Sequence, residues 1–472
     1  MSAVVRALAI GCGATLVACS ATHGAPAGSA VLDEAALRYG QAAPSAPAGV
    51  TYQRDVVVID GGAGAVRSAS ADGLVWTIDA AAPGVDELDV GEVAFLTSRA
   101  AGRVLAKEPA GGDVALTLAP VQLEEIIRDG HIRIDTTLRP ENAAIQPIPE
   151  LPGALGAPDE TDIETPPGFA MAPMRSARPE KPLPPPSRQG EAEISIGNFD
   201  INTTTSSSGV GLSASMKPGG VVKLGADVKL AFESMRATYD VLVAGGRINN
   251  STTMLIDGIT SLEASLYAGV AGGVEDNQKI KIELPWEIFN EPVVVYGIPM
   301  VFNLKMKIVF EMALVGENAT LKASGKWGLR GAVGKSGDHP AQPEFSVLHS
   351  IMDSIEGISL GPSGVALGVE YKFTAGVGVP GASAGPYAKL RVGVGVANGS
   401  ALGAPLVKCS SAKLNITGGA GVGMSLDKTV LDELTRYLPH QPKIKADLEA
   451  EKMWTIANPS DVRPKIPLCT GD

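Results

Sequence analysis

Residues 301–314 read VFNLKMKIVFEMAL, and this stretch decides the fold class. Apolar side chains stand at every even position from Phe302 to Leu314. The positions between them are mostly polar, with Asn303, Lys305, Lys307 and Glu311. Successive side chains of a β-strand point to opposite faces, so this alternation predicts a strand with one buried and one polar face. Such strands are typical of antiparallel sheets.

The same alternation recurs at residues 222–232, 365–379, 390–396 and 414–426. A strand of about 13 residues spans about 43 Å, well beyond the usual length of about five or six residues. Residues 193–472 are therefore predicted to form a large antiparallel β domain, either a β-sandwich or a curled, elongated sheet. One helix is expected at residues 428–438, before Pro439, and a weaker one at residues 443–453.

A smaller β-rich module is predicted at residues 51–140, ahead of the large domain. Its expected strands are residues 55–59, 74–78, 102–106 and 114–118, with turns that contain Gly between them. A short helix is expected at residues 122–128, because Leu123, Ile126 and Ile127 share one helical face. The fold class is therefore mainly β, with one or two short helices in the large domain.

The composition limits the class of protein. Of 472 residues, 56 are Gly and 34 are Pro, and the formal net charge is −12. An acidic chain argues against a nucleic-acid partner, because phosphate binding requires a basic surface. Many of the prolines gather in residues 141–192, which we interpret as a semi-rigid linker, with docking of a Pro-binding partner as the alternative. Residues 19–50 are rich in Ala, Gly, Pro and Ser, and we expect a flexible tether there.

Residues 1–18 have the pattern of a signal peptide. Arg6 precedes a run of apolar and small residues that is too short to cross a membrane as a helix. The run ends in Leu16-Val17-Ala18-Cys19, which resembles the bacterial lipobox. That resemblance implies lipid attachment to Cys19, cleavage before it and anchoring to a membrane by acyl chains. Ordinary secretory cleavage is the alternative.

The residue after Cys19 bears on the destination of such a lipoprotein. It is Ser20 rather than Asp, which resembles the default for sorting to the outer membrane if the source is Gram-negative. The remainder of the chain resembles no family of known activity.

Two cysteines remain once the signal segment and Cys19 are set aside. In an exported protein, Cys409 and Cys469 most simply form one disulfide. On the chain-entropy model, closing a loop of about 60 residues stabilises the fold by about 4 kcal/mol.

Several short motifs resemble catalytic ones without the context that the chemistry needs. Ser383 stands in a Gly-x-Ser-x-Gly pattern, but another alternating strand follows it instead of the helix of a nucleophile elbow. Gly334-Lys335-Ser336 resembles the end of a phosphate loop, but Leu329 stands where its first Gly is required. His339 and His349 lack the spacing of metal ligands. We therefore predict no catalytic, cofactor-binding or metal-ligating residue.

These observations favour a noncatalytic envelope lipoprotein with a binding or structural role. Its expected partners are the membrane, reached through acyl chains on Cys19, and either an apolar small molecule along the long strands or another envelope protein. An envelope hydrolase acting on glycan or peptide is one alternative. A membrane-inserting β-barrel or pore is the other, because strands of about 9–11 residues suffice to span a membrane.

Overall fold

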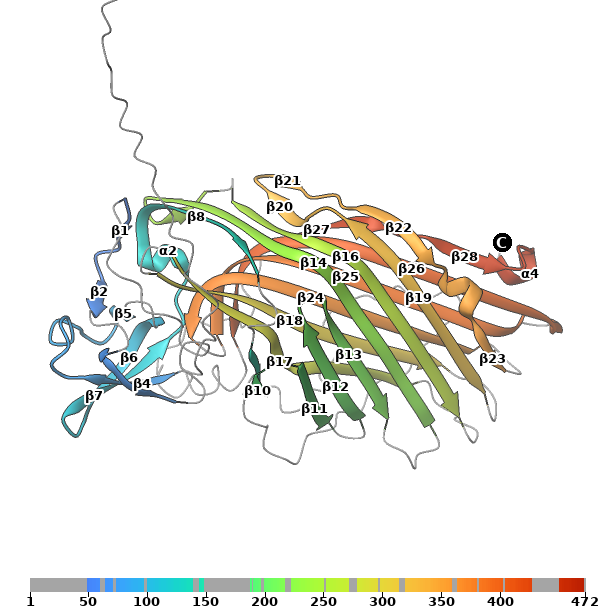
Figure 1. Cartoon of the computed structure of the whole chain (residues 1–472), viewed down its shortest axis with the longest axis horizontal. Coiled ribbons are helices and arrows are strands. Elements are labelled where there is room, and N and C mark those ends of the chain that lie inside the picture. The colour runs from blue at the N-terminus through green and yellow to red at the C-terminus, as the bar shows by residue number, and fades with distance from the viewer. Residues whose placement is uncertain are drawn as a thin grey trace, which may run out of the picture.

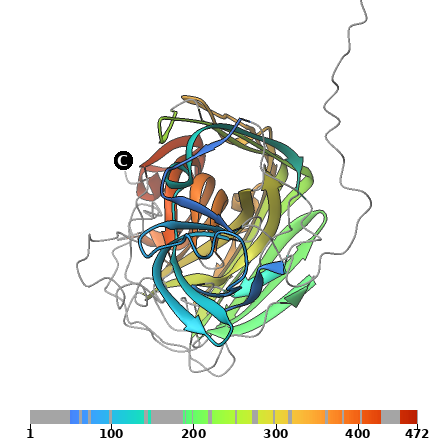
Figure 2. The same ribbon diagram turned by 90° about the vertical axis from the view of Figure 1, so that its left-hand side faces the viewer.

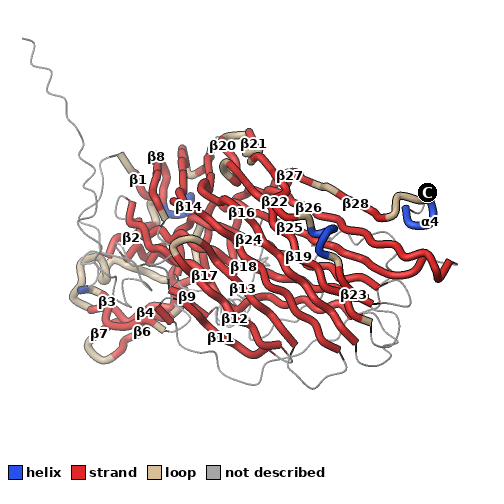
Figure 3. Tube along the Cα trace, turned by 45° about the vertical axis from the view of Figure 1, so that its right-hand side comes forward, coloured by secondary structure: helices blue, strands red, loops and turns tan. Residues whose placement is uncertain are grey.

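The computed structural model describes residues 49–59, 64–70, 74–96, 100–138, 144–147, 187–188, 190–196, 199–216, 222–249, 252–270, 278–295, 298–313, 319–358, 363–379, 382–401, 404–426 and 450–470. This part of the chain forms three β-sheets of six, thirteen and nine strands. The six-stranded sheet lies at one end, and the long strands of the other two run away from it (Figure 1). Helical segments are few and short (Figure 3). The predicted mainly β fold class is confirmed.

The six-stranded sheet forms the core of the small module. Its strands, in spatial order, are β2 (Val56–Ile59), β5 (Val93–Leu96), β6 (Ala100–Ala110), β7 (Asp113–Ala119), β4 (Val75–Asp79) and β3 (Val66–Ala69). β2 and β5 are parallel, and the other neighbours are antiparallel. Trp76, Ile78 and Leu116 are fully buried on one face. The predicted Gly111–Gly112 turn joins β6 to β7.

The thirteen-stranded sheet, called the first sheet here, is antiparallel throughout. Its main path is β11 (Gly190–Ile196), β12 (Phe199–Ser206), β13 (Gly209–Met216), β14 (Val222–Ala244), β16 (Thr253–Val270), β19 (Thr320–Arg330) and β22 (Glu344–His349). The remaining strands are β1 (Thr51–Tyr52), β8 (Ile127–Thr137), β15 (Arg247–Ile248), β20 (Val333–Ser336), β21 (His339–Pro340) and β23 (Glu356–Ile358). Because β8 pairs with β14, the small module continues directly into this sheet.

The nine-stranded sheet, called the second sheet, contains the longest hairpins. Its path is β10 (Ser187–Arg188), β9 (Ala144–Pro147), β17 (Gln278–Val295), β18 (Ile298–Ala313), β24 (Ser363–Val379), β25 (Ala382–Ala401), β26 (Ala404–Leu426) and β27 (Ala450–Ala457), with β28 (Ser460–Arg463) also on β26. Two short helices lie at η3 (Ile351–Ser354) and α4 (Pro467–Thr470). The strands β9 and β10 fall inside the segment predicted to be a linker.

The two large sheets pack face to face. β16 and β20 of the first sheet lie against β25 of the second, and buried apolar side chains of both sheets belong to one core cluster. Figure 2 shows the green strands of the first sheet and the orange strands of the second on opposite sides of the molecule. Val93, Phe95 and Ala101 of the small module join the same cluster. The described residues combine the two expected architectures, because the two large sheets pack on each other and their strands curl around the shared core (Figure 2).

A β-bulge divides β14 into two halves. Up to Phe232 the even-numbered residues face the core, and from Met235 onward the odd-numbered residues do so. The register of β14 with β16 shifts between Phe232 and Arg236, where Ser234 has a φ of 50°. One extra residue moves every later side chain to the other face, which explains why the sequence pattern stops at Phe232.

The helices differ from expectation in two places. Helix α2 (Leu123–Ile126) is shorter than predicted, because Ile127 starts β8 and pairs within the first sheet. The predicted weaker helix is wrong at residues 450–453, which belong to β27 and pair with β26, so sheet pairing overrides helix propensity there. Residues 428–438 and 443–449 lie outside the described residues. No described helix has the length and apolarity needed to cross a membrane.

Candidate functional site

The face of the second sheet that points away from the sandwich core holds a set of charged side chains. On β24 the odd-numbered residues enter the core, so Glu370, Lys372 and Thr374 occupy the opposite face. On β25 the core takes the even positions, which leaves Tyr387, Lys389 and Arg391 beside them. Thr374, Tyr387 and Lys389 are only 2%, 1% and 4% exposed. The sheet is therefore buried on both faces at this point, and its second face is polar.

Three of these side chains, Glu370, Lys389 and Arg391, form an ion network with Glu451 of β27. The Lys389 Nζ atom lies 2.9 Å from Glu451 Oε2 on β27 and 4.0 Å from Glu370 Oε1 on β24. Arg391 is paired with Glu370 and lies 3.8 Å from Glu451 Oε1. Burying charges is costly unless they are paired, so the network supplies the compensation that Lys389 requires.

The ring of Tyr387 contacts two lysines of this face. The Nζ atoms of Lys372 and Lys389 lie 4.4 Å and 5.0 Å from the centroid of the Tyr387 ring. Ammonium groups at this distance over a ring are attracted to its electron-rich face. Tyr387 thereby screens two like charges that stand directly opposite each other on β24 and β25.

A glycine on β26 makes room for the network. Gly419 pairs with Lys389 on one side and with Met453 on the other. A Cβ atom at this position would lie 2.4 Å from the Met453 sulfur, 3.0 Å from Glu451 Oε1 and 3.2 Å from Lys389 Cβ. The missing side chain thus lets Glu451 reach across β26 to Lys389, which gives one physical reason for the Gly-rich pattern of these strands.

The strand register extends the positive charge to a third strand. Lys305 on β18 stands opposite Lys372, which in turn stands opposite Lys389. We call these three residues the lysine row. Neighbouring strands lie about 4.8 Å apart, so the row spans about 10 Å at the backbone.

Two polar atoms beside the row lack a hydrogen-bond partner. Among the described residues, Thr374 Oγ1 and Glu451 Oε1 are buried and receive no hydrogen bond. Thr374 stands opposite Tyr387 and follows Lys372 by two residues, so it lies on the same face. The face therefore combines ammonium, guanidinium and hydroxyl donors with the carboxylates of Glu370 and Glu451, which already pair with Arg391 and Lys389.

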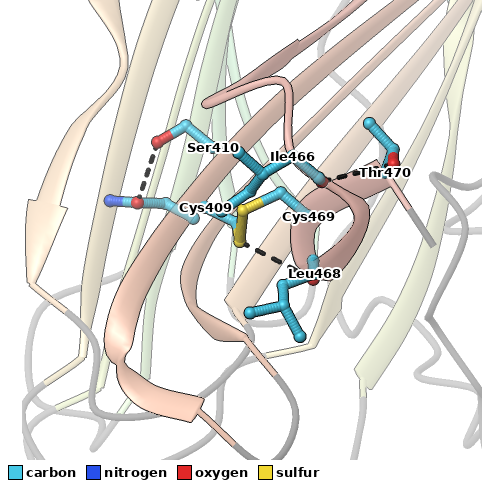
Figure 4. The surroundings of a disulfide bond; sticks show 7 residues. Cys409, Ser410, Ile466, Leu468, Cys469 and Thr470 are labelled. Atoms are coloured by element: carbon cyan, nitrogen blue, oxygen red, sulfur yellow. Dashed lines mark hydrogen bonds between the residues drawn. A yellow bond between two sulfur atoms is a disulfide. The ribbon is translucent and has the colours of Figure 1, made fainter. Parts of the chain in front are cut away.

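The predicted disulfide pair lies at the far end of the same sheet. The sulfur atoms of Cys409 and Cys469 are 1.98 Å apart and connect β26 to α4 (Figure 4). Cys19 lies outside the described residues. Near the disulfide, Arg463 Nη1 donates to Asp353 Oδ1 at 2.6 Å, which joins β28 to η3 of the opposite side of the sandwich.

The catalytic-looking motifs lie in strands. Ser383 is part of β25 and stands between Gly378 and Ser425. Gly334, Lys335 and Ser336 form the end of β20, and a turn and β21 follow instead of a helix.

The sequence-based interpretation missed the ion network, because its members occupied the polar positions of alternating strands. The signal available was the recurrence of charge at Glu370 and Lys372 and again at Lys389 and Arg391, within otherwise apolar and Gly-rich strands.

Two family models match this chain. One, described as Domain of unknown function (DUF8402), matches residues 180–452, and the other, described as Domain of unknown function (DUF8403), matches residues 35–129. No curated protein and no solved structure matches. The lysine row and the ion network fall entirely within the first match, and the six-stranded sheet falls within the second.

Proposed function

The chain belongs to the family described as Domain of unknown function (DUF8402), and we propose that it is a noncatalytic binding or structural lipoprotein of the cell envelope. In this proposal, acyl chains on Cys19 hold the protein at a membrane, and the folded body presents its surfaces to another envelope component. The observation that supports the anchoring is the stretch Leu16-Val17-Ala18-Cys19, which resembles the bacterial lipobox.

The continuity of the body supports a scaffold role. The small module contributes Val93, Phe95 and Ala101 to the core shared by both large sheets. Its chain also enters the first sheet directly, through β8 on β14. A common core and a common sheet hold the small module and the two large sheets in a fixed arrangement. A tethered spacer or platform requires such a rigid body.

The apolar faces of the two large sheets pack against each other, which also favours a structural role for the long strands. Leu230 on β14 and Leu367 on β24 are both fully buried within the one core cluster. The apolar faces thus contact each other in the described sandwich. Organic extraction of the purified protein followed by mass spectrometry tests the other form of the proposal, in which an apolar molecule lies between these strands.

Metabolic labelling in a bacterial host tests the anchor. With an alkyne-bearing palmitate analogue, the wild-type chain is expected to take up label and to sediment with membranes. The Cys19→Ser variant is expected to lose both properties, since the thiol is the acceptor. Equal labelling of wild type and C19S, or no labelling of the wild type, would contradict the proposal.

Matched variants separate the anchor from the other cysteines. Cys12→Ser changes a residue that departs with the signal segment, so its product is expected to keep the label. Cys469→Ser removes a disulfide partner and is expected to keep the label as well. In a Gram-negative host, Ser20→Asp is expected to leave labelling intact and to move the protein from the outer to the inner membrane.

A further inference from the structure

The disulfide Cys409–Cys469 joins two segments at one end of the second sheet, residues 404–413 and 464–470, which we call the disulfide tip. We propose that this tip docks on an anionic phospholipid surface, with Leu406 and Leu468 entering the lipid and its lysines meeting the headgroups. The inference rests on the proposed anchoring, which places a membrane beside the protein. It adds how the folded body meets that membrane.

The exposure of two leucines supplies the first argument. Leu406, on β26, is 97% exposed, more than any other large apolar residue in the described part of the chain, and Leu468, on α4, is 56% exposed. A single exposed leucine is common on soluble proteins. These two come from distant segments, and the Cys409 sulfur lies 4.0 Å from the Leu468 carbonyl oxygen (Figure 4). The disulfide therefore holds the second leucine beside the strand that carries the first.

The charge of the tip supplies the second argument. Its charged residues are Lys408, Lys413 and Lys465, and it contains no acidic residue, whereas the whole chain has a net charge of −12. Lys408 and Lys465 are exposed, and the nearby Asp461 Oδ1 lies 3.8 Å from the Lys465 Nζ atom. Lysines beside apolar residues that enter a membrane keep their ammonium groups among the headgroups. An anionic phospholipid surface offers both the apolar layer and the negative charge that match the tip.

The position of the tip determines how the body would lie. β26 starts in the tip and has 23 residues, so it spans about 76 Å. The small module and β1 lie at the opposite end of the molecule from α4 (Figure 1). The chain between Cys19 and β1 therefore joins the body at the end remote from the tip. Attachment at both ends would lay the body along the membrane instead of leaving it to project from the anchor.

Vesicle flotation of the mature chain without acyl chains, residues 20–472, tests the docking. This chain contains every described residue, and its binding does not depend on lipid at Cys19. It is expected to bind phosphatidylglycerol vesicles with a partition constant of about 10³–10⁴ M⁻¹, at most that of one acyl chain, and phosphatidylcholine vesicles at least about fivefold more weakly. No binding to phosphatidylglycerol at millimolar lipid would overturn the docking, whereas failure of the anchor is seen separately, in the labelling of Cys19.

Substitutions locate the binding surface. Leu406→Asp and Leu468→Asp are each expected to weaken binding by at least about tenfold, because each exchanges an apolar side chain for a charge that the lipid repels. Lys408→Gln is expected to weaken it by about fivefold. Leu348→Asp is the control: Leu348 lies on β22, outside the tip, and is 58% exposed, so this variant is expected to bind as the wild type does. Equal losses in L348D and L468D, or wild-type binding by both L406D and L468D, would refute docking through the tip.

Tryptophan fluorescence separates insertion into lipid from contact between proteins. Leu406→Trp in the acylated full chain is expected to add emission that brominated phospholipids quench more strongly than they quench the four native tryptophans. Circular dichroism of each variant checks the fold, which is expected to persist because Leu406 is exposed. No additional quenching in L406W would exclude insertion. A concentration-dependent dimer that L406D abolishes, without vesicle binding, would assign the tip to a second copy of the chain and overturn the lipid docking.

Discussion

The carboxyl group of Glu124, on helix α2, lies close enough to the Tyr239 hydroxyl, on β14, to raise the pKa of that hydroxyl beyond the effect of its complete burial. Glu124 Oε2 and Tyr239 Oη are both buried and lack hydrogen-bond partners among the described residues. The pair lies where the small module meets the first sheet. One oxygen of the Glu124 carboxyl group and the Tyr239 hydroxyl are thus buried in this junction without a hydrogen bond to compensate them.

The first prediction concerns the pH dependence of this junction. Burial is the main cause that raises the pKa of Glu124 above its ordinary 4.5, and the neighbouring Glu125 adds to it. The folded state therefore binds a proton more tightly than the unfolded state. The corresponding stability is fully present below pH 4.5 and is lost as the pH rises through the higher folded value.

Glu124→Gln removes the cost of burying an ionised carboxylate at this position. The variant is expected to be more stable than the wild type at pH 7 and equal to it near pH 4, as measured by urea denaturation. The gain is expected to stay below about 1 kcal/mol, because the carboxylate is partly solvated. Glu125→Gln is the matched control: Glu125 pairs with Arg103 at 2.9 Å and accepts from the Gln122 amide, so this variant is expected to lose stability at pH 7. A gain in E125Q as large as that in E124Q would refute the assignment.

The second prediction concerns the disulfide. Cys409 and Cys469 close a loop of 60 residues, so the pair is expected to contribute about 4 kcal/mol to the free energy of unfolding. Denaturation in guanidinium chloride, with and without reductant, measures this difference. The double variant C409S/C469S is expected to match the reduced wild type and to show no response to reductant. A response of the double variant to reductant would mean that the stabilisation comes from elsewhere.

The third prediction concerns the bulge of β14. Gly258 lies opposite it with a φ of 92°, and a Cβ atom there would lie 2.6 Å from the Glu233 carbonyl oxygen. Gly258→Ala is expected to lower the melting temperature and to cost more than about 1 kcal/mol, because it adds a clash to a left-handed backbone. Gly245 has a φ of 58° and open space around its Cβ position. Gly245→Ala therefore measures the cost of placing alanine in a left-handed backbone without a clash. Equal losses of stability in the two variants would mean that the clash at Gly258 contributes nothing.

The bulge also shows how far the sequence predicts this fold. Alternation identifies strands at Val222–Phe232 and Phe302–Leu314, because one face of each must be apolar to build the core. It fails beyond Phe232, since Ser234 changes the phase and the pattern no longer has a period of two. The short strands β9 and β10 escape detection for a different reason: they form by pairing with strands that are distant in the sequence, and local preference does not specify them.

The sequence predicts less about the ion network around Lys389 than about the strands that carry it. Period-two alternation says which residues share a face, and the ranges 365–379 and 390–396 placed Glu370 and Arg391 correctly on the face opposite the apolar residues. It does not say whether that face meets water. A polar face of a strand is normally expected to be exposed to water, whereas Lys389 is only 4% exposed. The pairing of Lys389 with Glu451, 62 residues later in the chain, depends on β27 joining β26, which no local pattern specifies.

The fourth prediction compares two cross-strand ion pairs that differ in burial. Lys389→Met leaves Glu370 and Glu451 with Arg391 as the one cation of the network, and Lys389 is the more deeply buried of the two cations. The substitution is therefore expected to cost up to about 3–5 kcal/mol in the free energy of unfolding. The double variant K389M/E451L is expected to recover part of that loss, because the second substitution removes one of the stranded carboxylates. Guanidinium denaturation of the wild type, both single variants and the double variant gives the coupling energy directly.

Lys326 and Glu263 provide the matched control on the first sheet. They are also paired across neighbouring strands in register, but their side chains are 43% and 38% exposed. Lys326→Met is therefore expected to cost less than about 1 kcal/mol, since water already solvates both charges. If K389M cost no more than K326M, the four-residue network would behave as a solvated surface. The second face of the second sheet would then be open to water at Lys389, contrary to its burial.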